Sequence, residues 1–262
     1  MSGFEIVRDR RAGWVVMLDG FPQSHVNPDD PLDLAFEYVA LAAAAIDAVL
    51  AGPGPLRVTH VGGAGLTLPR WIAATRPGSP QIVLEPDAAL TAAVRERLPL
   101  PRGHRIRVRA VDGVRGVAAL RDGSADLLII DAFDNGRIPA DLAALPFLTD
   151  CARVLAPDGL VVVNIADEPD GRYDDRVAAG LRAAGLVHTI LLATTDIAKG
   201  RRFGNRILLG SERAIDVGAL SRRVRQLPWP ARVFAPRPAR PFTGDARPSP
   251  QPPPMERGWR VR

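Results

Sequence analysis

The stretch Arg-Val-Thr-His-Val-Gly-Gly-Ala-Gly at residues 57–65 decides the fold. It reads as a short apolar strand that runs into a glycine-rich turn, with a helix expected just beyond it at residues 68–74. Glycines let the backbone turn tightly and approach a ligand, and the start of a helix offers unpaired N–H groups. The turn is not the G-x-G-x-x-G of a dinucleotide site, because Leu68 stands at the third glycine position. A ligand site and a purely structural turn are both open here.

Strand and helix patterns alternate after this turn. Apolar strands are expected at residues 57–61, 81–84, 105–110, 126–130 and 160–164, with helices at 68–74, 88–98, 114–120, 140–155 and 174–184. The strand cores are apolar on both faces, as in a parallel sheet that is covered by helices. Residues 186–194 and 202–210 look like two closing strands with no helix between them, and a last helix is expected at 216–226. The pattern predicts an α/β fold with a doubly wound, seven-stranded, mostly parallel sheet.

The two ends of the chain differ from this central part. Residues 1–30 predict a short N-terminal β-hairpin with strands at 5–8 and 13–18, and the nucleotide-binding domain should span 31–230, starting with a helix at 31–50. Residues 231–262 hold seven arginines and two acidic residues, whereas the rest of the chain holds 27 basic and 27 acidic residues. The Pro/Arg-rich tail is therefore expected to be disordered. Because the remainder has no basic excess, we expect no nucleic-acid partner.

Several classes of protein are disfavoured by composition. The single cysteine, Cys151, rules out an internal disulfide and is expected to be a buried structural thiol. The four histidines lack ligand spacing, so no metal is expected, and His60 reads as a satisfied core histidine. No apolar run approaches the roughly 20 residues of a membrane helix, and the N-terminus lacks a secretory pattern. We expect a cytoplasmic protein without a membrane partner.

Acidic residues follow the second and third strands of the predicted sheet. Glu85 comes twenty residues after Gly65, at a strand end where a carboxylate can accept hydrogen bonds from both ribose hydroxyls of an adenosine. Asp87 reads as the N-cap of the next helix. Asp112 can accept from an adenine amino group while Gly113 leaves room for the ring, or Asp112 can be a plain helix cap. Both interpretations of Asp112 stay open.

An acidic pair follows the fourth strand. Residues 126–130 form a buried strand that delivers Asp131 to the sheet edge, and Asp134 follows three residues later in a loop. Two carboxylates here could bind an ammonium group, or accept its proton when an amine attacks a carbon that a sulfonium activates. In the alternative interpretation Asp131 caps the strand end and Asp134 begins an Asp-Asn-Gly turn.

Together these residues resemble the spermidine synthase (aminopropyltransferase) family, within the class I S-adenosylmethionine-dependent methyltransferase-like Rossmann proteins. The resemblance covers roughly residues 14–211. It rests on Leu-Asp-Gly-Phe-Pro-Gln-Ser at 18–24, the glycine turn at 62–65, Asp-Gly at 112–113, the aspartates after the fourth strand and Ala-Pro-Asp-Gly at 156–159. It implies cofactor-binding roles for Gln23, Gly62, Gly63, Gly65, Glu85, Asp112, Gly113 and Asp131, and catalytic roles for Asp131 and Asp134. The cofactor implied is S-adenosylmethionine or its decarboxylated form, with no metal.

Three positions depart from the family pattern. Gly65 stands where the family keeps an aspartate that holds the aminopropyl amine, so the resemblance implies that ordinary S-adenosylmethionine is tolerated. The family's Tyr-His-Glu helix is here only Phe-Glu-Tyr at 36–38. Arg137 adds a cation to the loop that would face a polyamine. The nucleotide site is therefore better matched than the polyamine site.

Three functions are compatible with this pattern. The first is a spermidine synthase-like enzyme that transfers an aminopropyl group to a polyamine, as the paired aspartates favour. The second is an S-adenosylmethionine-dependent methyltransferase with an unknown small acceptor, as Gly65 favours. The third is a non-catalytic nucleotide-binding relative. The broken glycine pattern disfavours an NAD-dependent dehydrogenase. We expect a small-molecule substrate, and an amine acceptor and a homodimer are the candidates that stay open.

Overall fold

The structure, a computed structural model, describes residues 3–237 and residue 249. Its strands and helices, in chain order, are β1 (Phe4–Arg8), β2 (Trp14–Leu18), β3 (Phe21–Val26), α1 (Glu37–Val49), β4 (Val58–Val61), α2 (Thr67–Thr75), β5 (Gln81–Leu84), α3 (Ala88–Arg97), β6 (Ile106–Arg109), α4 (Gly113–Ala118), β7 (Ala125–Ile130), the 3-10 helix η1 (Ala140–Ala143), α5 (Leu145–Val154), β8 (Leu155–Asp167), α6 (Arg172–Ala183), β9 (His188–Thr194), α7 (Thr195–Ala198), β10 (Gly204–Ser211), α8 (Val217–Val224) and β11 (Ala231–Phe234).

Within the described part of the chain the main sheet has eight strands, in the order β11-β9-β10-β8-β7-β4-β5-β6. Strands β4 to β8 run parallel to one another. β10 is antiparallel to both β8 and β9, and β11 is antiparallel to β9. The chain moves outward from β4 to β5 and β6 and then returns to β7 on the other side of β4. This reversal of strand order lies at the carboxyl ends of β4 and β7, where open α/β sheets bind their ligands.

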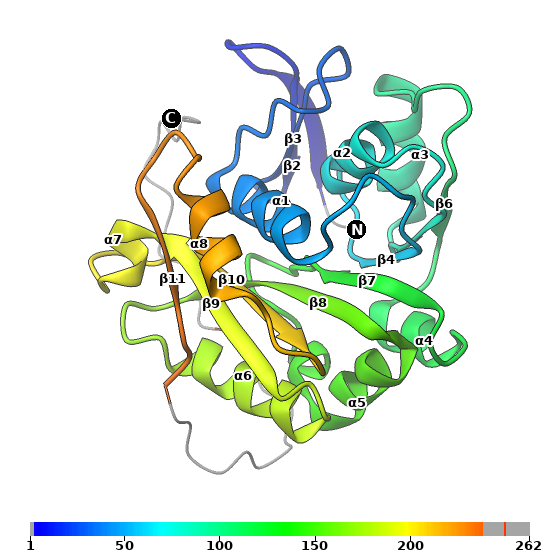
Figure 1. Cartoon of the computed structure of the whole chain (residues 1–262). Coiled ribbons are helices and arrows are strands. Elements are labelled where there is room, and N and C mark those ends of the chain that lie inside the picture. Colours follow the sequence, from blue (N-terminus) through cyan, green and yellow to red (C-terminus); the bar gives the residue numbers. More distant parts are fainter. Residues whose placement is uncertain (1–2, 238–248, 250–262) are drawn as a thin grey trace.

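Helices cover both faces of the main sheet (Figure 1). On one face α1, α2 and α8 pack with Leu127 and Ile129 of β7. On the other face α4, α5 and α6 pack with Leu128 and Ile130 of the same strand. Successive side chains of a strand point to opposite faces, so each face of β7 enters its own core. This arrangement explains why the strand is apolar throughout.

The α/β sheet is confirmed, and its seven predicted strands are joined by an eighth. Strand β11 pairs with β9 and lies beyond the boundary that was predicted at residue 230. The prediction was wrong here because arginines and prolines dominate the composition, whereas hydrogen bonds to the open edge of β9 order these four residues. Residues 238–248 and 250–262 of the expected tail lie outside the described residues.

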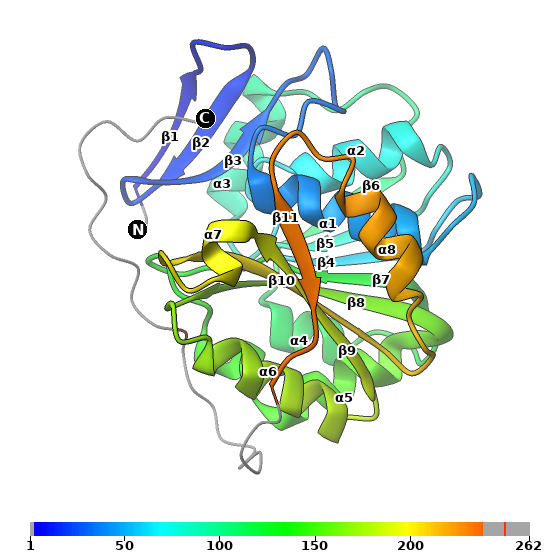
Figure 2. The same ribbon diagram turned by 60° about the vertical axis from the view of Figure 1, so that its left-hand side comes forward.

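The predicted N-terminal hairpin is confirmed as β1 paired with β2, and β3 extends it to a three-stranded antiparallel sheet. Pro22 counts against a strand in the sequence, but β3 is an edge strand, where a missing N–H is tolerated. The register between β2 and β3 shifts between Val16 and Met17. Figure 2 shows this small sheet standing beside α2 and α3, against which it packs through a separate apolar cluster.

Two helices also differ from the sequence-based expectations. α1 begins at Glu37 and not at residue 31. The Asn27 side chain accepts hydrogen bonds from the backbone N–H groups of Asp29 and Asp30, at 3.2 and 3.3 Å, and such a turn competes with a helix. The short helix α7 lies between β9 and β10, where none was expected. Four residues are too few to show a helical period in a sequence.

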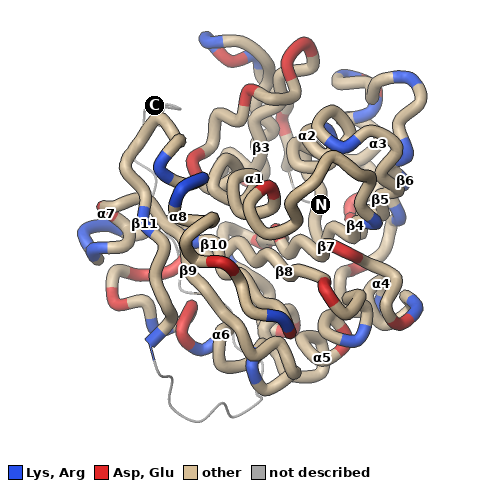
Figure 3. The backbone as a smooth tube through the Cα atoms, viewed as in Figure 1, with Lys and Arg blue, Asp and Glu red and all other residues tan. Residues whose placement is uncertain are grey.

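Basic and acidic positions are interspersed around the described part of the chain (Figure 3). None of its helices has the length and apolar character that a membrane crossing would require. The described residues also contain no group of three or more histidine, cysteine or acidic side chains that could hold a metal ion. Cys151 is fully buried, as expected, and burial raises the pKa of its thiol.

Candidate functional site

The glycine turn joins the ends of three strands. Gly62 has a φ of +86°, and a Cβ at this position would lie 2.2 Å from the carbonyl oxygen of Asp131. Only glycine is compatible with both constraints. The Gly62 N–H donates to the carbonyl of Leu84 at 2.9 Å, and a Cβ on Gly63 would meet the side chain of Val83 at 2.7 Å. The turn therefore brings the carboxyl ends of β4, β5 and β7 together.

Every amide of the turn at residues 62–65 already has a partner. The N–H groups of Gly63 and Ala64 donate to one oxygen of Glu85, at 3.1 and 3.3 Å. The Gly65 N–H donates to the hydroxyl of Ser24 at 3.1 Å. Glycine loops that bind phosphate present free N–H groups to the anion. This turn has none to offer, which disfavours a phosphate or carboxylate ligand at this point.

Glu85 lies at the carboxyl end of β5, as its spacing predicted. Its second oxygen accepts from the backbone N–H of Asp87 at 3.0 Å. A carboxylate has about four acceptor sites, so one remains for a ligand hydroxyl after these three bonds. Asp87 is confirmed as the N-cap of α3, because its side chain accepts from the Leu90 N–H at 2.8 Å.

Asp112 and Gly113, which follow β6, both have a clear structural role. Asp112 caps α4 by accepting from the Arg115 N–H at 2.9 Å. A Cβ on Gly113 would lie 2.4 Å from the side chain of Val61 and 3.2 Å from that of Leu142. Gly113 therefore allows close packing of α4 against β4. The cap is one of the two interpretations considered for Asp112, and an adenine contact stays a prediction.

Asp131 is held from two sides at the end of β7. The side-chain amide of Asn164, on the neighbouring strand β8, donates to one carboxylate oxygen at 2.8 Å. The hydroxyl of Tyr38, in the first turn of α1, lies 3.4 Å from the other oxygen. These contacts fix the carboxylate plane. Burial raises the pKa of Asp131 to about 6, although both hydrogen bonds act in the opposite direction. A carboxyl group with this pKa is suited to exchange protons near neutral pH.

A narrow cavity of about 40 Å³ opens beside this carboxylate. Its lining comes from the turn, α1, α2, β3 and the strand ends: Gln23, Ser24, Tyr38, Val39, His60, Gly62, Gly63, Ala64, Thr67, Leu68, Pro69, Ile129 and Asp131. Among these described residues no lysine or arginine is present. Burial lowers the pKa of His60 to about 4, so this imidazole is neutral at pH 7. Asp131 therefore carries the formal charge of this lining, and its negative sign favours a ligand with a cationic group.

His60 is also satisfied by a protein partner. Its ring nitrogen Nε2 lies 2.9 Å from the side-chain oxygen of Gln81, which is buried. The expected core histidine is therefore confirmed, although one side of it faces the cavity.

Gly65 lies outside this cavity lining. A Cβ at this position would meet the side chains of Ser24 and Val26 at 2.8 Å, and that of Val16 at 3.2 Å. Those residues belong to the N-terminal sheet. The position therefore serves as a close contact between the turn and this sheet. An aspartate at Gly65 would therefore collide with side chains of that sheet.

Asp134 is placed apart from Asp131. It begins a tight turn in which its N–H and the carbonyl of Arg137 are 2.8 Å apart, and Asn135 and Gly136 both have positive φ. Its carboxylate is exposed and accepts from the Asn135 side chain at 3.0 Å. The structure thus shows the turn that was the alternative interpretation. A catalytic role for Asp134 stays a prediction without a supporting contact.

Two of the residues that contact Asp131, Tyr38 and Asn164, were not predicted from the sequence. In the sequence Tyr38 stands out only as part of an incomplete family motif, and Asn164 only as the end of an apolar strand. Asn164 is 4% exposed, and its side-chain oxygen has no partner in the described structure. A polar residue at the end of an otherwise apolar strand is the sequence feature that could have identified it.

No protein-family model matches the chain. Among curated proteins it is similar to the polyamine aminopropyltransferases of Neisseria meningitidis and Chromobacterium violaceum, with 27% and 29% identity over 143 residues. That segment is 54% of this chain, and the chain spans about half, 53%, of the length of these relatives. A longer match, 27% over 205 residues, covers 75% of this chain and 70% of the polyamine aminopropyltransferase of Halorhodospira halophila.

Solved structures extend the similarity to almost the whole chain. The probable spermidine synthase from Corynebacterium glutamicum superposes with a TM-score of 0.82 and 29% identity, over 99% of this chain and 96% of that one. The chain resembles the spermidine synthase family in both sequence and fold. Spermidine synthase from Thermotoga maritima shares the fold at 20% identity, with a TM-score of 0.61 over 87% of this chain and 78% of its own. The family resemblance read from the sequence is therefore confirmed, together with the N-terminal sheet that accompanies it.

Proposed function

We propose that this protein, like the spermidine synthases it resembles, binds decarboxylated S-adenosylmethionine and transfers its aminopropyl group to an amine. The observation that carries the proposal is the placement of Asp131 in a cavity with no cationic lining residue among those described. The satisfied amides of the glycine turn add to it, because the carboxylate of ordinary S-adenosylmethionine would find no free donor there. Both observations count against the expectation, drawn from Gly65, that ordinary S-adenosylmethionine is tolerated.

Each proposed role follows from position. Glu85 would accept one ribose hydroxyl at the end of β5, and Asp112 and Gly113 would border the adenine after β6. Gln23, Gly62 and Gly63 line the cavity, in which the aminopropyl chain would lie. Asp131 would accept the proton of the attacking amine. Its two hydrogen-bond partners, Tyr38 and Asn164, would keep its carboxylate oriented.

The proposed reaction is a nucleophilic displacement. The lone pair of the acceptor amine forms a bond to the aminopropyl carbon that adjoins the sulfonium sulfur. The carbon–sulfur bond breaks, and its electron pair stays on sulfur as the neutral thioether of methylthioadenosine. The amine proton passes to Asp131 and then to solvent. A positioned carboxylate of this kind contributes about 10²–10⁴-fold to a rate.

The decisive experiment measures the nucleoside product. Purified protein is incubated with decarboxylated S-adenosylmethionine and a panel of di- and polyamines, and methylthioadenosine release is followed by chromatography. We expect release that depends on the amine. Methyl transfer is the second candidate, favoured by the missing acid at Gly65, and S-adenosylhomocysteine formed from ordinary S-adenosylmethionine would support it. Absence of methylthioadenosine with every amine would refute aminopropyl transfer.

Removing Glu85 should weaken binding of the nucleoside. Glu85→Ala deletes the proposed ribose acceptor and also frees the amides of Gly63 and Ala64. Hydrogen bonds to a charged group are worth about 1.5–3 kcal/mol, so affinity for methylthioadenosine should fall roughly tenfold to 100-fold. Titration calorimetry measures this. Asp87→Ala is the matched control, since it costs about 1 kcal/mol of stability through the α3 cap and should leave affinity unchanged. Equal affinity in Glu85→Ala and wild type would remove Glu85 from the site.

A further inference from the structure

Ser249 is a described residue of the expected tail, and it is fully buried, with 0% of its surface exposed. Its backbone N–H donates to the carbonyl of Ile138 at 3.2 Å, and its hydroxyl accepts from the Ile138 N–H at 2.8 Å. Its carbonyl accepts from Nε of Arg137 at 2.7 Å. Three hydrogen bonds thus join this one residue to the loop that follows β7. The disorder expected for the whole tail is wrong at this position.

The local sequence prepares Ser249 for this contact. It lies between Pro248 and Pro250, and neither proline has a backbone N–H. A residue before proline is also restricted to extended conformations. Ser249 therefore carries the one N–H of this tripeptide, in the conformation that pairs with another chain segment. Its hydroxyl is the acceptor for the Ile138 N–H, and the side chain of proline has no polar atom that could replace it.

Ser249 supplies both backbone hydrogen-bond partners of a buried residue in this loop, Ile138. Ile138 is 2% exposed and packs in the core beneath the sheet. Both of its backbone polar groups are paired with Ser249. A buried backbone group that loses its partner is strongly disfavoured, so the loop would have to rearrange to reach water. Asp131 lies at the start of the same loop, seven residues before Ile138.

The same contact places the cation of Arg137. Its Nε donates to Ser249, and Arg137 is not among the residues that line the cavity beside Asp131. If it were released, this guanidinium would be free to approach an amine-binding site, where like charges repel. Ser249 thus contacts both the backbone of this loop and the side chain of Arg137.

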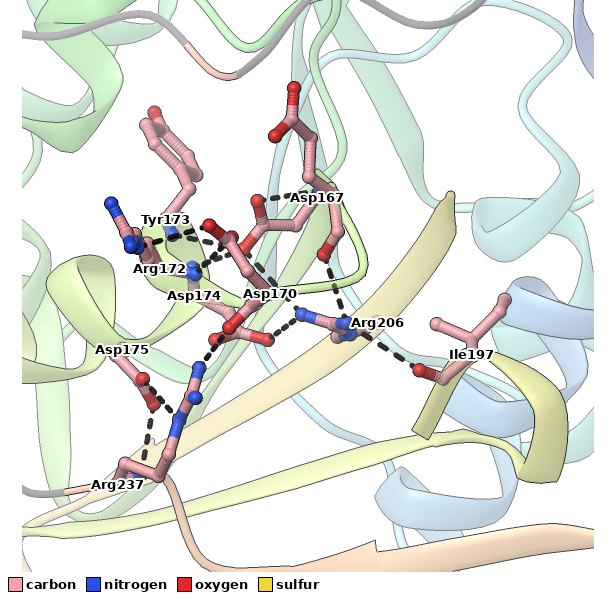
Figure 4. A network of polar contacts seen from close by, with 10 residues as sticks. Asp167, Asp170, Arg172, Tyr173, Asp174, Asp175, Ile197, Arg206 and Arg237 are labelled. Carbon is pink, nitrogen blue, oxygen red and sulfur yellow. Dashed lines mark hydrogen bonds and ion pairs between the residues drawn. The ribbon is translucent and has the colours of Figure 1, made fainter. Parts of the chain in front are cut away.

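A second described contact fixes the chain before Ser249. Arg237 donates through its backbone N–H and its Nε to the carboxylate of Asp175 on α6, at 2.9 and 2.8 Å. Figure 4 shows its guanidinium also reaching the carbonyl of Asp170. The chain is therefore held at α6 and again at the loop after β7, with residues 238–248 between the two points.

We infer that Ser249 is a positioning residue, which holds the loop at residues 131–139 and the side chain of Arg137 in the arrangement that admits an amine acceptor. The inference rests on the proposed function for its effect on the acceptor. Its structural part, the fixing of the loop, can be tested without turnover.

The test uses the full-length chain with Ser249→Ala, which removes the acceptor for the Ile138 N–H, and Ser249→Pro, which removes the N–H that donates to Ile138. Hydrogen exchange by mass spectrometry follows peptides that cover residues 131–139. We expect exchange there to be at least about tenfold faster in both variants, with peptides of α3 unchanged. Ser124→Ala, whose hydroxyl bonds only within its own turn, is the matched control and should exchange like wild type. Wild-type exchange of this loop in both Ser249 variants would overturn the inference.

Kinetic measurements distinguish a positioning role of Ser249 from a general effect on stability. With amine-dependent turnover, KM for the acceptor should rise about tenfold in Ser249→Ala while KM for the nucleotide stays constant. Adding Arg137→Gln should recover part of the acceptor KM, because the released cation is gone. Equal rises in both KM values, or no recovery, would contradict the role in acceptor binding. If the protein has no transferase activity, the proposed function fails while the exchange result still decides whether Ser249 holds the loop.

Discussion

Asp131→Asn should abolish amine-dependent release of methylthioadenosine, with a fall in kcat of about 10²–10⁴-fold. The amide keeps nearly the same shape and can still bond to Asn164, so the cavity should persist while the proton acceptor is lost. Steady-state release of methylthioadenosine under saturating amine measures the effect. Calorimetric affinity for methylthioadenosine should stay close to the wild-type value, because the adenosine side of the site is formed by other residues.

Asp134→Asn is the matched control for this variant. Its carboxylate is exposed and bonds to Asn135 in its own turn, so kcat should change by less than about threefold. If both variants lose activity equally, the two aspartates act together, as the family resemblance implied. A fully active Asp131→Asn protein would eliminate Asp131 as the proton acceptor and with it the proposed mechanism.

The pH profile follows from the same carboxyl group. Since the pKa of Asp131 is about 6, the ionised acceptor form should accumulate, and kcat should rise, as pH increases through 6. The effect on stability has the opposite sign. The folded state keeps a proton that the unfolded state releases between about pH 4 and 6, so the free energy of unfolding falls across that window. The fall is at most about 3 kcal/mol, and it should disappear in Asp131→Asn.

Strand ends were the most predictable part of the site. Glu85 and Asp131 each follow a run of apolar residues, and parallel strands of one sheet deliver their carboxyl ends to the same edge. The pattern of apolar runs and acids is therefore enough to place both carboxylates near the glycine turn. It could not show that Glu85 would bond to the amides of that turn, because this depends on the exact path of the backbone.

Side-chain direction was less predictable than position. Gly65 was expected to line the ligand site, but Ala64 and Leu66 on either side of it both have positive φ, and the turn directs its Cβ position toward the N-terminal sheet. Left-handed conformations at residues other than glycine are uncommon, so a sequence gives little warning of them. Ser249 was missed for a different reason. A composition rich in proline and arginine describes the average of a segment and cannot identify which of its residues find partners.

Stability should depend strongly on a buried ion network at the carboxyl end of β8 (Figure 4). Arg206 of β10 is 4% exposed, and one of its guanidinium nitrogens lies 2.5 Å from Asp174 and 3.5 Å from Asp167. Burial raises the pKa of Asp174 to about 6, although the nearby Arg206 cation lowers it. Asp167 also accepts from the N–H groups of Tyr173 and Asp174, which fixes the start of α6. The Arg206 cation therefore serves two buried carboxylates.

Arg206→Leu should lower the free energy of unfolding by about 3–5 kcal/mol at pH 8, because it leaves buried charge without a partner. For a chain of this size the melting temperature should fall by roughly 10 °C. Urea unfolding followed by circular dichroism measures the change. Arg202→Leu is the matched control: its ion pair with Glu37 is exposed on both sides, and its loss should cost less than about 1 kcal/mol.

The pH dependence of that loss distinguishes an electrostatic cause from a packing defect. Without the cation the carboxyl pKa of Asp174 should rise further, so the deficit of Arg206→Leu should grow as pH increases from 5.5 to 8 and the buried carboxyl groups ionise. Adding Asp174→Asn removes one of the two charges and should restore part of the stability at pH 8. A deficit that is equal at both pH values and unaffected by Asp174→Asn would mean that Arg206 stabilises the fold by filling space and not by its charge.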